Sequence, residues 1–240
     1  GDSAIYTLKV TNSSTSALSD FVLIDKLPQV GDTGTLETYA GRESEFSVNL
    51  ADSPKVTVKK GDMDITSQAV ISYKEAVADA AFTKNDWAGA GNDWTNEKQE
   101  GSNVIRINLS GVNVARGETI TVTFDAKVGT DAAIGEIAWN SFGYAYKGTN
   151  TSQRLYAEPA KVGIKIYGKE ISLKKKWEDI TGYTRPALGG GVKIRVIGKT
   201  AEGQVGYEQV HSDIAWTESD DKTWTAKISG LPIRYEGKDL

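Results

Sequence analysis

The chain has 240 residues, of which 39% are hydrophobic and 25% are charged, and its formal net charge is −4. This composition can bury a core, and the acidic balance argues against nucleic acid as a partner, because phosphate binding needs a clustered excess of Lys and Arg. The chain has no Cys and one His, so it has no disulfides and no Cys- or His-rich metal site is expected, and no apolar run is long enough to predict a membrane span.

Apolar and polar residues alternate in short segments along the whole chain, which is the pattern of half-buried β-strands. Turn-forming Gly, Asn and Asp residues separate these segments, as reversals between antiparallel neighbours require. Many short strands joined by such turns predict an all-β chain of Ig-like β-sandwiches. The alternating positions are Tyr6, Leu8 and Val10; Phe21 and Leu23; Ile105, Ile107 and Leu109; Ile120, Val122 and Phe124; and Val192, Ile194 and Val196.

Residues 73–82 are rich in Ala, a strong helix former, so we expect one short helix at most and place it there. A long loop rich in Gly, Asn and Asp follows over residues 84–94 and carries Trp87 and Trp94. Loops of this length are often functional, and Trp is common in binding contacts. The two tryptophans are therefore candidate contacts for a host protein or a glycan, or they fold back as a lid on the sandwich.

The same loop contains oxygen ligands of the kind that calcium prefers. Asp86, Asn92 and Asp93 supply carboxylate and amide oxygens within eight residues of one another. Their spacing matches no EF-hand loop, so they are a weak calcium candidate, and we expect no other cofactor.

A shift in composition near residues 160–170 marks the expected domain boundary. An alternating segment over residues 162–166 completes the first part, and a polar break follows it. We expect a first domain over residues 1–167, with a long insertion, and a second domain over residues 168–240. The second is short for an independent domain, so we expect it to be incomplete.

From Ile171 onward, a strand ends in Lys-x-Trp-x-Asp and is followed by an Arg-Pro turn, a middle strand, a Trp-containing hairpin and a Leu-Pro turn. These motifs lie at residues 175–179, 185–186, 192–196, 223–225 and 230–232. In this order they resemble the Cna B-type repeats of Gram-positive surface proteins. The resemblance implies that the second domain is a β-sandwich.

The first 165 residues open with Gly-Asp, continue with Tyr-x-hydrophobic-x-Val-x-Asn and Asp-x-Leu-Pro, and close with Gly-Glu-Ile-Ala-Trp-Asn-Ser. These motifs lie at residues 1–2, 6–12, 25–28 and 135–141, and residues 35–100 match no motif. The segment resembles the larger Ig-like modules of Gram-positive adhesins and pilins, called Cna A-like or conserved-repeat domains.

Both resemblances imply an internal isopeptide bond, which forms once between a Lys amine and an Asn side chain beside a buried acid, with loss of ammonia. Burial keeps the amine uncharged and the acid protonated, and fixed contact supplies the effective concentration. In the first domain the matching residues are Lys9, Asn140 and, as the acid, Asp25. Simple alternation nevertheless points Lys9 away from the face of Leu8.

In the second domain the family pattern names Lys175 as the bond-forming residue. Period-two geometry places it on the same face as Leu173 and Trp177, so it lies on the apolar side of its strand. We expect its Asn and Glu partners to lie beyond Leu240.

These features predict a structural module of an adhesin or pilus subunit that is extracellular and attached to the cell wall. The expected partners are a host extracellular protein or glycan, or neighbouring surface subunits. The alternative is a host-protein- or carbohydrate-binding module that uses the loop from Trp87 to Trp94. An enzyme is not expected, because no spacing singles out a pair of carboxylates for glycoside hydrolysis.

Overall fold

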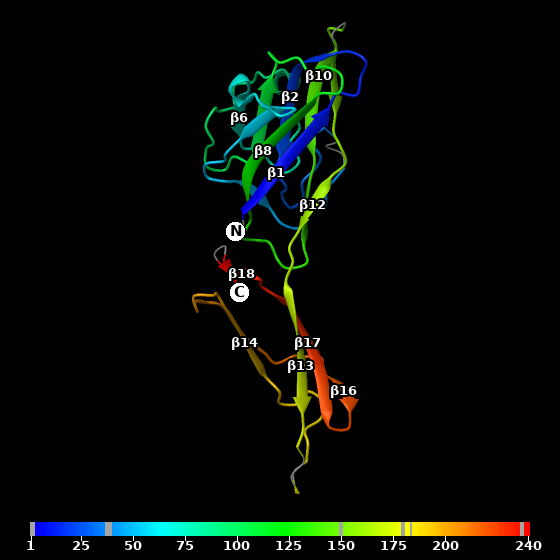
Figure 1. The fold of residues 1–240 in the computed structure, drawn as a ribbon, viewed down its shortest axis with the longest axis vertical. Helices are drawn as coiled ribbons and strands as arrows, with labels where there is room; N and C mark the ends of the chain where they lie inside the picture. Colours follow the sequence, from blue (N-terminus) through cyan, green and yellow to red (C-terminus); the bar gives the residue numbers. More distant parts are fainter. Residues whose placement is uncertain (1–2, 37–39, 149–150, 179–180, 183, 236–237) are drawn as a thin grey trace. The chain divides into compact units, whose positions relative to one another are not determined.

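The regular secondary structure of the chain is almost entirely β, and the chain divides into two compact units, Gly1–Ile164 and Lys165–Leu240 (Figure 1). A computed structural model describes residues 3–36, 40–148, 151–178, 181–182, 184–235 and 238–240. The all-β prediction is confirmed. The boundary expected after residue 167 falls between strands β12 (Val162–Lys165) and β13 (Lys169–Lys176). Within the described ranges, none of the helices has the length and apolar character needed to cross a membrane.

Unit 1 contains two five-stranded antiparallel sheets. Sheet I has the order β1 (Ser3–Thr11), β8 (Thr119–Val128), β4 (Thr57–Lys60) and β5 (Met63–Asp64), and β3 (Val48–Leu50) also pairs with β8. Sheet II has the order β11 (Arg154–Ala157), β10 (Phe142–Gly148), β2 (Leu18–Lys26), β7 (Val104–Leu109) and β6 (Val70–Lys74). A separate pair joins β9 (Ile137–Asn140) to β12.

The alternation seen in the sequence places the core between the two sheets. On β1, the side chains of Tyr6, Leu8 and Val10 are buried and those between them are exposed. Across the β1–β8 ladder, Tyr6 pairs with Phe124, and their rings stack with centroids 5.4 Å apart. Strand β2 differs, because every residue from Phe21 to Lys26 is buried, so both of its faces are covered.

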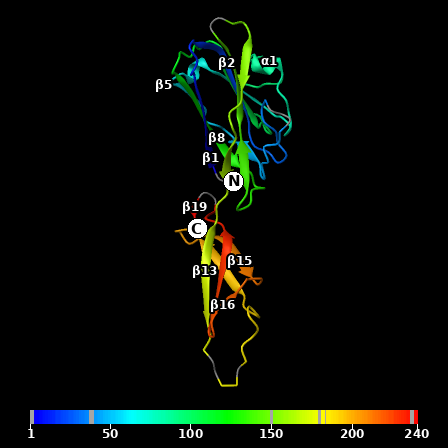
Figure 2. The same cartoon turned by 90° about the vertical axis from the view of Figure 1, so that its right-hand side faces the viewer.

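The second face of β2 is covered by residues 75–103, which we call the lid. Figure 2 shows α1 (Lys84–Trp87), part of the lid, on the opposite side of β2 from β1 and β8. Trp87 is 3% exposed and packs into a core cluster with Val22 and Ile24 of β2. Gly143 on β10 has no side chain to block the indole, whose nearest carbon would lie 2.5 Å from an added Cβ.

The helix predicted over residues 73–82 is wrong. Strand β6 continues to Lys74, and the side chain of Asn103 pairs with both the N–H and the carbonyl of Ala76, each at 2.8 Å. The buried ammonium of Lys26 then donates to the carbonyls of Ala78 and Ala80, at 2.6 and 3.3 Å. Backbone groups that a helix would pair internally are therefore held by side chains. The helix instead begins after Thr83, whose side chain and Asp86 form a capping box.

Unit 2 is smaller and has a core of tryptophans. One sheet has the order β13, β17 (Thr223–Leu231) and β16 (Thr217–Asp220), and two hairpins pair β14 (Ile194–Lys199) with β15 (Val205–His211) and β18 (Arg234–Tyr235) with β19 (Lys238–Asp239). Trp216, Trp224 and Ala226 are buried together, and Leu173 and Trp177 pack against them. Alternation along β13 places this apolar face on one side of the strand.

Replacing Trp87 with Ala should destabilise unit 1 by about 3–5 kcal/mol, because it removes the largest side chain that joins the lid to β2. Urea unfolding followed by circular dichroism measures this change. Val77→Ala is a matched control in the lid, because Val77 is 70% exposed, and it should change the unfolding free energy by less than about 0.5 kcal/mol. Equal effects of the two substitutions would contradict the packing of the lid.

Candidate functional site

Two of the residues singled out in the sequence, Asp25 and Asn140, meet inside unit 1. Asp25 lies on β2 and points to the same face as Phe21 and Leu23, and Asn140 is the last residue of β9. The side-chain amide of Asn140 donates from Nδ2 to Oδ2 of Asp25 at 3.1 Å. Asp25 is 0% exposed and Asn140 4%, so this acid–amide pair is shielded from solvent.

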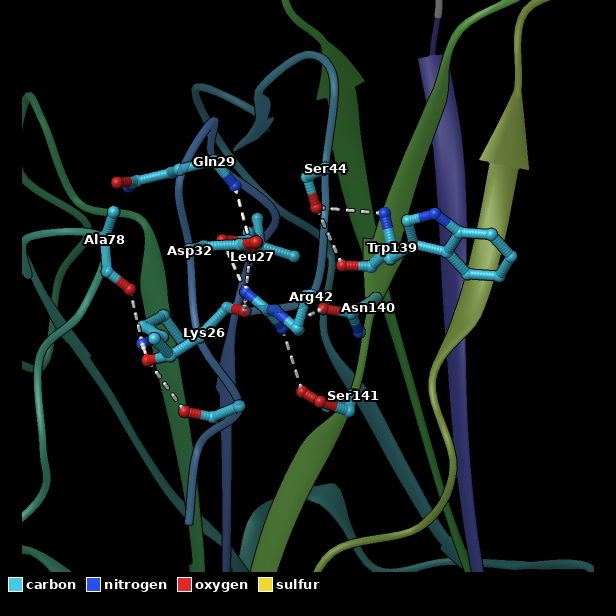
Figure 3. Close-up of polar contacts among 12 residues, drawn as sticks. Lys26, Leu27, Gln29, Asp32, Arg42, Ser44, Ala78, Trp139, Asn140 and Ser141 are labelled. Atoms are coloured by element: carbon cyan, nitrogen blue, oxygen red, sulfur yellow. Dashed lines mark hydrogen bonds and ion pairs between the residues drawn. The ribbon is translucent and has the colours of Figure 1, made fainter. Parts of the chain in front are cut away.

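The guanidinium of Arg42 lies at the other end of the same amide (Figure 3). Its Nη1 donates to Oδ1 of Asn140 and to the carbonyl of Ser141, both at 3.2 Å, and its Nη2 donates to the carbonyl of Lys26 at 2.8 Å. A guanidinium has no acceptor, so the amide oxygen must face Arg42 and the amide nitrogen must face Asp25.

Asp32 neutralises Arg42 in this buried position. Its Oδ2 lies 2.5 Å from Nη2 of Arg42 and also accepts from the backbone N–H of Gln29 at 2.9 Å. Both side chains are almost wholly buried. A buried ion pair with such additional hydrogen bonds is costly to break, because the remaining partner would be an uncompensated charge. The orientation of the guanidinium toward Asn140 is therefore fixed by its surroundings.

We did not single out Arg42 from the sequence as a site residue, although the alternating pattern around it indicates that it is buried. Arg42 is in phase with Ser44, Phe46, Val48 and Leu50, and all five alternate positions are buried. Period-two alternation over residues 42–50 would have placed this Arg on the apolar face.

Burial raises the pKa of Asp25 to about 7, and the hydrogen bond from Asn140 and the positive charge of Arg42 only partly oppose this shift. The carboxyl is therefore protonated in a substantial fraction of molecules near neutral pH. Its Oδ1 is buried and has no hydrogen-bond partner among the described residues. An unpaired buried polar atom costs roughly 1–3 kcal/mol, so packing alone does not explain an acid at this position.

Tyr6 places a second unpaired polar atom nearby. The side chain is buried, and its hydroxyl has no hydrogen-bond partner in the described part of the chain. Burial, followed by the negative charge of Asp25, raises the pKa of Tyr6 far above its ordinary value, so the phenol remains protonated.

Tyr6 and Asn140 both line a cavity of about 200 Å³. Strand β1 supplies one wall, the β9–β10 junction a second and β12 a third. The walls are mainly apolar, and their hydrophobic side chains belong to Ile5, Leu8, Phe142, Val162 and Ile164. The acid–amide pair therefore has an apolar approach on the side of β1.

This arrangement is suited to exchange at the amide of Asn140. Arg42 polarises the carbonyl and can stabilise the negative charge that develops on Oδ1 during attack. Asp25 lies against the nitrogen that would leave and can supply a proton to it. The guanidinium, and not the acid, is therefore the group that faces the carbonyl oxygen of the amide.

The structure does not bring Lys9 to this pair. Lys9 is exposed on β1, opposite Thr121 of β8, and lies on the other face from Tyr6 and Leu8. The regular β1–β8 register has no bulge that would turn it inward. The expectation that Lys9 is the partner of Asn140 is therefore corrected. The alternating pattern of β1 already indicated that Lys9 points outward.

Lys26 is next to Asp25 in sequence but points to the opposite face of β2. Its amine is buried under the lid, donates to lid carbonyls and to Thr33 Oγ1 at 3.2 Å, and has its pKa lowered to about 8 by burial. No described lysine amine donates a hydrogen bond to Asn140 or Asp25. The structure therefore contains the acid and the amide of the expected bond without its amine.

In unit 2, Lys175 lies on the half-buried face of β13 that it shares with Leu173 and Trp177. Its amine is 4.6 Å from the ring centroid of Trp177, a cation–π contact. None of the contacts described here tests a bond at Lys175, which stays a prediction.

Trp87 and Trp94 are positioned as lid residues. Trp87 is buried against Phe82 and Tyr156. Trp94 is half-buried, donates from Nε1 to Oδ1 of Asp86 at 2.6 Å and has the guanidinium of Arg106 4.2 Å from its ring centroid. The burial of Trp87 does not fit its expected role as an exposed contact, whereas a binding role for Trp94 stays a prediction.

We do not propose a calcium site at Asp86, Asn92 and Asp93. Thr83 and Trp94 already donate to the two carboxylate oxygens of Asp86. The amine of Lys74 forms an ion pair with Asp93 and lies 4.0 Å from Asp86, where it already supplies the positive charge. Asn92 is exposed and adds no ligand to this group.

No family model and no curated protein matches the chain. Among solved structures, it is similar to the full-length major pilin SpaD from Corynebacterium diphtheriae, with 15% identity, a TM-score of 0.40, and coverage of 100% of this chain and 48% of that one. It is also similar to a 35 kDa C-terminal fragment of the major pilin GBS80 of Streptococcus agalactiae, with 10% identity, a TM-score of 0.38, and coverage of 98% and 81%.

A third similar structure is the pilus backbone RrgB from Streptococcus pneumoniae, with 15% identity, a TM-score of 0.28, and coverage of 100% and 70%. The chain thus spans about half the length of SpaD. The identities and TM-scores are low, so the function proposed below is argued from the residues of this chain.

The raised pKa of Asp25 predicts a specific pH dependence of stability. Because the folded pKa of about 7 exceeds the ordinary 3.8, the folded state holds the proton more tightly, and its stability falls as the pH rises from 3.8 to 7. Relative to Asp25→Asn, the wild type should lose roughly 4 kcal/mol over this window and change little above it. Urea unfolding of both proteins between about pH 4 and pH 8 measures the difference, and a constant difference would contradict the raised pKa.

The separation of Lys9 from Asn140 predicts the covalent state of the purified 240-residue protein. Its intact mass should equal the mass calculated from the sequence, because no described amine reaches Asn140. Mass spectrometry with an accuracy better than one dalton tests this, since a bond would remove one ammonia, about 17 Da. A deficit of that size, with Asn140 joined to Lys9 in a digest, would contradict the placement of β1.

Proposed function

We propose that the chain is a structural module of a bacterial cell-surface protein, an adhesin or pilus subunit, and that unit 1 carries the acceptor half of a lysine–asparagine cross-link. The observation that carries this proposal is the buried amide of Asn140, held between Arg42 and Asp25. The motifs that resemble Cna modules suggest the setting, which is extracellular and attached to the cell wall, with neighbouring surface subunits as partners.

The proposed reaction is a single amide exchange. A neutral lysine amine attacks Cγ of Asn140, so that a new C–N bond forms and the bond from Cγ to Nδ2 breaks. Asp25 relays a proton from the attacking amine to the departing nitrogen, which leaves as ammonia, while Arg42 stabilises the intermediate oxyanion. Atoms and charges balance, because the lysine amine and the Asn140 amide are the reactants and the new amide and ammonia are the products, with no oxidant needed. Each chain reacts once, so the module has no turnover and is not an enzyme.

A cross-link of this kind suits a load-bearing protein without cysteines. Because no described amine of this chain reaches Asn140, the cross-link would join it to another chain. An amide, unlike a disulfide, is not broken by thiol exchange or reduction. Subunits joined in this way would stay connected outside the cell with no disulfide.

A small alkylamine tests whether Asn140 is activated. We expect n-pentylamine, incubated with the native protein near pH 8, to add its mass less that of ammonia, at Asn140 alone. Asn49, exposed on β3, is an internal control that should remain unmodified. Asp25→Asn should slow the addition at least tenfold, provided that circular dichroism shows a folded protein.

Two results would overturn the proposed chemistry. One is a failure of the native protein to form any adduct at Asn140 under conditions in which it remains folded. The other is an adduct that forms equally fast in Asp25→Asn, because the acid would then have no part in the exchange.

A further inference from the structure

The outer edge of β1 is open. Strand β1 is the first strand of sheet I and pairs with β8 alone among the described strands. It runs for nine residues without a proline or a shift in register. Exposed sheet edges present unpaired backbone groups, and proteins usually protect them with bulges, prolines or covering segments. The described part of β1 has neither a bulge nor a proline, and β12 and the β9–β10 junction lie across the cavity from this edge without pairing with it.

Large apolar side chains flank this edge. Ile5 on β1 is 73% exposed and Val162 on β12 is 72% exposed. Both line the cavity beside Asn140, which therefore lies next to the unpaired edge of β1. Figure 1 shows β12 beside β1. A strand added to β1 would cover these residues and project alternate side chains toward the cavity.

The polar groups of the cavity select one kind of side chain. Its walls are apolar, and the buried hydroxyl of Tyr6 and the Oδ1 of Asp25, which lies against Asn140, lack partners among the described residues. An apolar cavity whose lining includes Tyr6 and Asn140, with Asp25 hydrogen-bonded to Asn140, complements an amine on a hydrocarbon stem. An anionic side chain would meet the acid, because Arg42 is already paired with Asp32.

We infer that the open edge of β1 accepts an extended strand from a neighbouring surface subunit and that this strand delivers a lysine side chain into the cavity beside Asn140. The amine would donate to Asp25 and Tyr6, and main-chain hydrogen bonds to β1 would hold the strand. The covalent step that follows rests on the proposed function, whereas the docking does not. The incoming strand should carry apolar residues two positions before and after the lysine, since these share its face.

An eleven-residue peptide of alternating Thr and Val, with Lys at the central Val position, is a direct probe. We expect it to bind the 240-residue protein, as measured by calorimetry, and to shift the backbone NMR signals of β1. A peptide with norleucine at the centre has the same stem without the amine and should bind at least tenfold more weakly. A third peptide, N-methylated on alternate residues of the edge that pairs, should not bind detectably.

Variants of the protein separate amine recognition from general adhesion. Asp25→Asn should weaken the Lys peptide at least tenfold and leave the norleucine peptide unchanged. Tyr6→Phe should weaken the Lys peptide several-fold while the protein remains at least as stable, because the lost hydroxyl has no partner in the described structure. Lys9→Ser is the matched surface control on β1 and should change neither affinity more than twofold.

The outcomes distinguish this inference from the proposed function. If pentylamine modifies Asn140 but no peptide binds, docking at β1 is overturned and the proposed chemistry stands. If the Lys peptide binds but neither probe forms an adduct, docking is supported and the cross-link is overturned. Equal binding of the Lys and norleucine peptides overturns amine recognition. Covalent dimers of the chain alone, joined from Lys175 to Asn140, would overturn the neighbouring subunit as the source and assign a second copy instead.

Discussion

The position of the Arg42 guanidinium determines the rest of the site. It joins the end of β2, the segment that contains Asp32, and the β9–β10 junction, which are far apart in sequence. A buried guanidinium needs its charge compensated and its N–H groups paired. These three segments supply the Asp32 carboxylate and acceptors for Nη1 and Nη2, while Nε has no partner among the described residues. Because the guanidinium of Arg42 cannot accept a hydrogen bond, it also fixes which end of the Asn140 amide faces the acid. The geometry of amide exchange is thus a consequence of satisfying one buried cation.

Buried polar atoms without partners lie on both sides of the Asn140 amide. On the carbonyl side, the Arg42–Asp32 pair is closely bonded and immobilises Asn140, although Nε of Arg42 and Oδ1 of Asp32 lack partners among the described residues. On the other side, Asp25 Oδ1 and the Tyr6 hydroxyl lack partners in the described structure, near a cavity with apolar walls. A core selected only for stability would replace those groups with apolar ones, since each unpaired atom costs free energy. Their retention is explained if an amine occupies the cavity.

Local alternation predicted strands such as β1 and β8 well, because each has one face on the core. The same rule contains the information for Arg42 and for the outward direction of Lys9. Local composition failed for residues 73–82, where the Ala content predicted a helix. The hydrogen bonds that compete with a helix there come from Lys26 and Asn103, which lie elsewhere in the sequence. Such long-range side-chain bonds leave no local pattern. The pairing of Asp25 with Asn140 could be reached only through motif resemblance, since 115 residues separate them.

Each unit holds only some of the groups that a lysine–asparagine bond needs, and the groups of one unit complement those of the other. This bears on how such modules would be joined. Unit 1 holds an acid and an amide without an amine, and unit 2 holds Lys175 on an apolar strand face, flanked by Leu173 and Trp177. Strand β13, like β1, is an edge strand with one described neighbour. An edge strand that carries a lysine between apolar residues has the pattern required of the incoming strand. The sequence of β13 therefore shows that this pattern is compatible with a folded β-sandwich module, as a lysine donor on a neighbouring subunit would have to be.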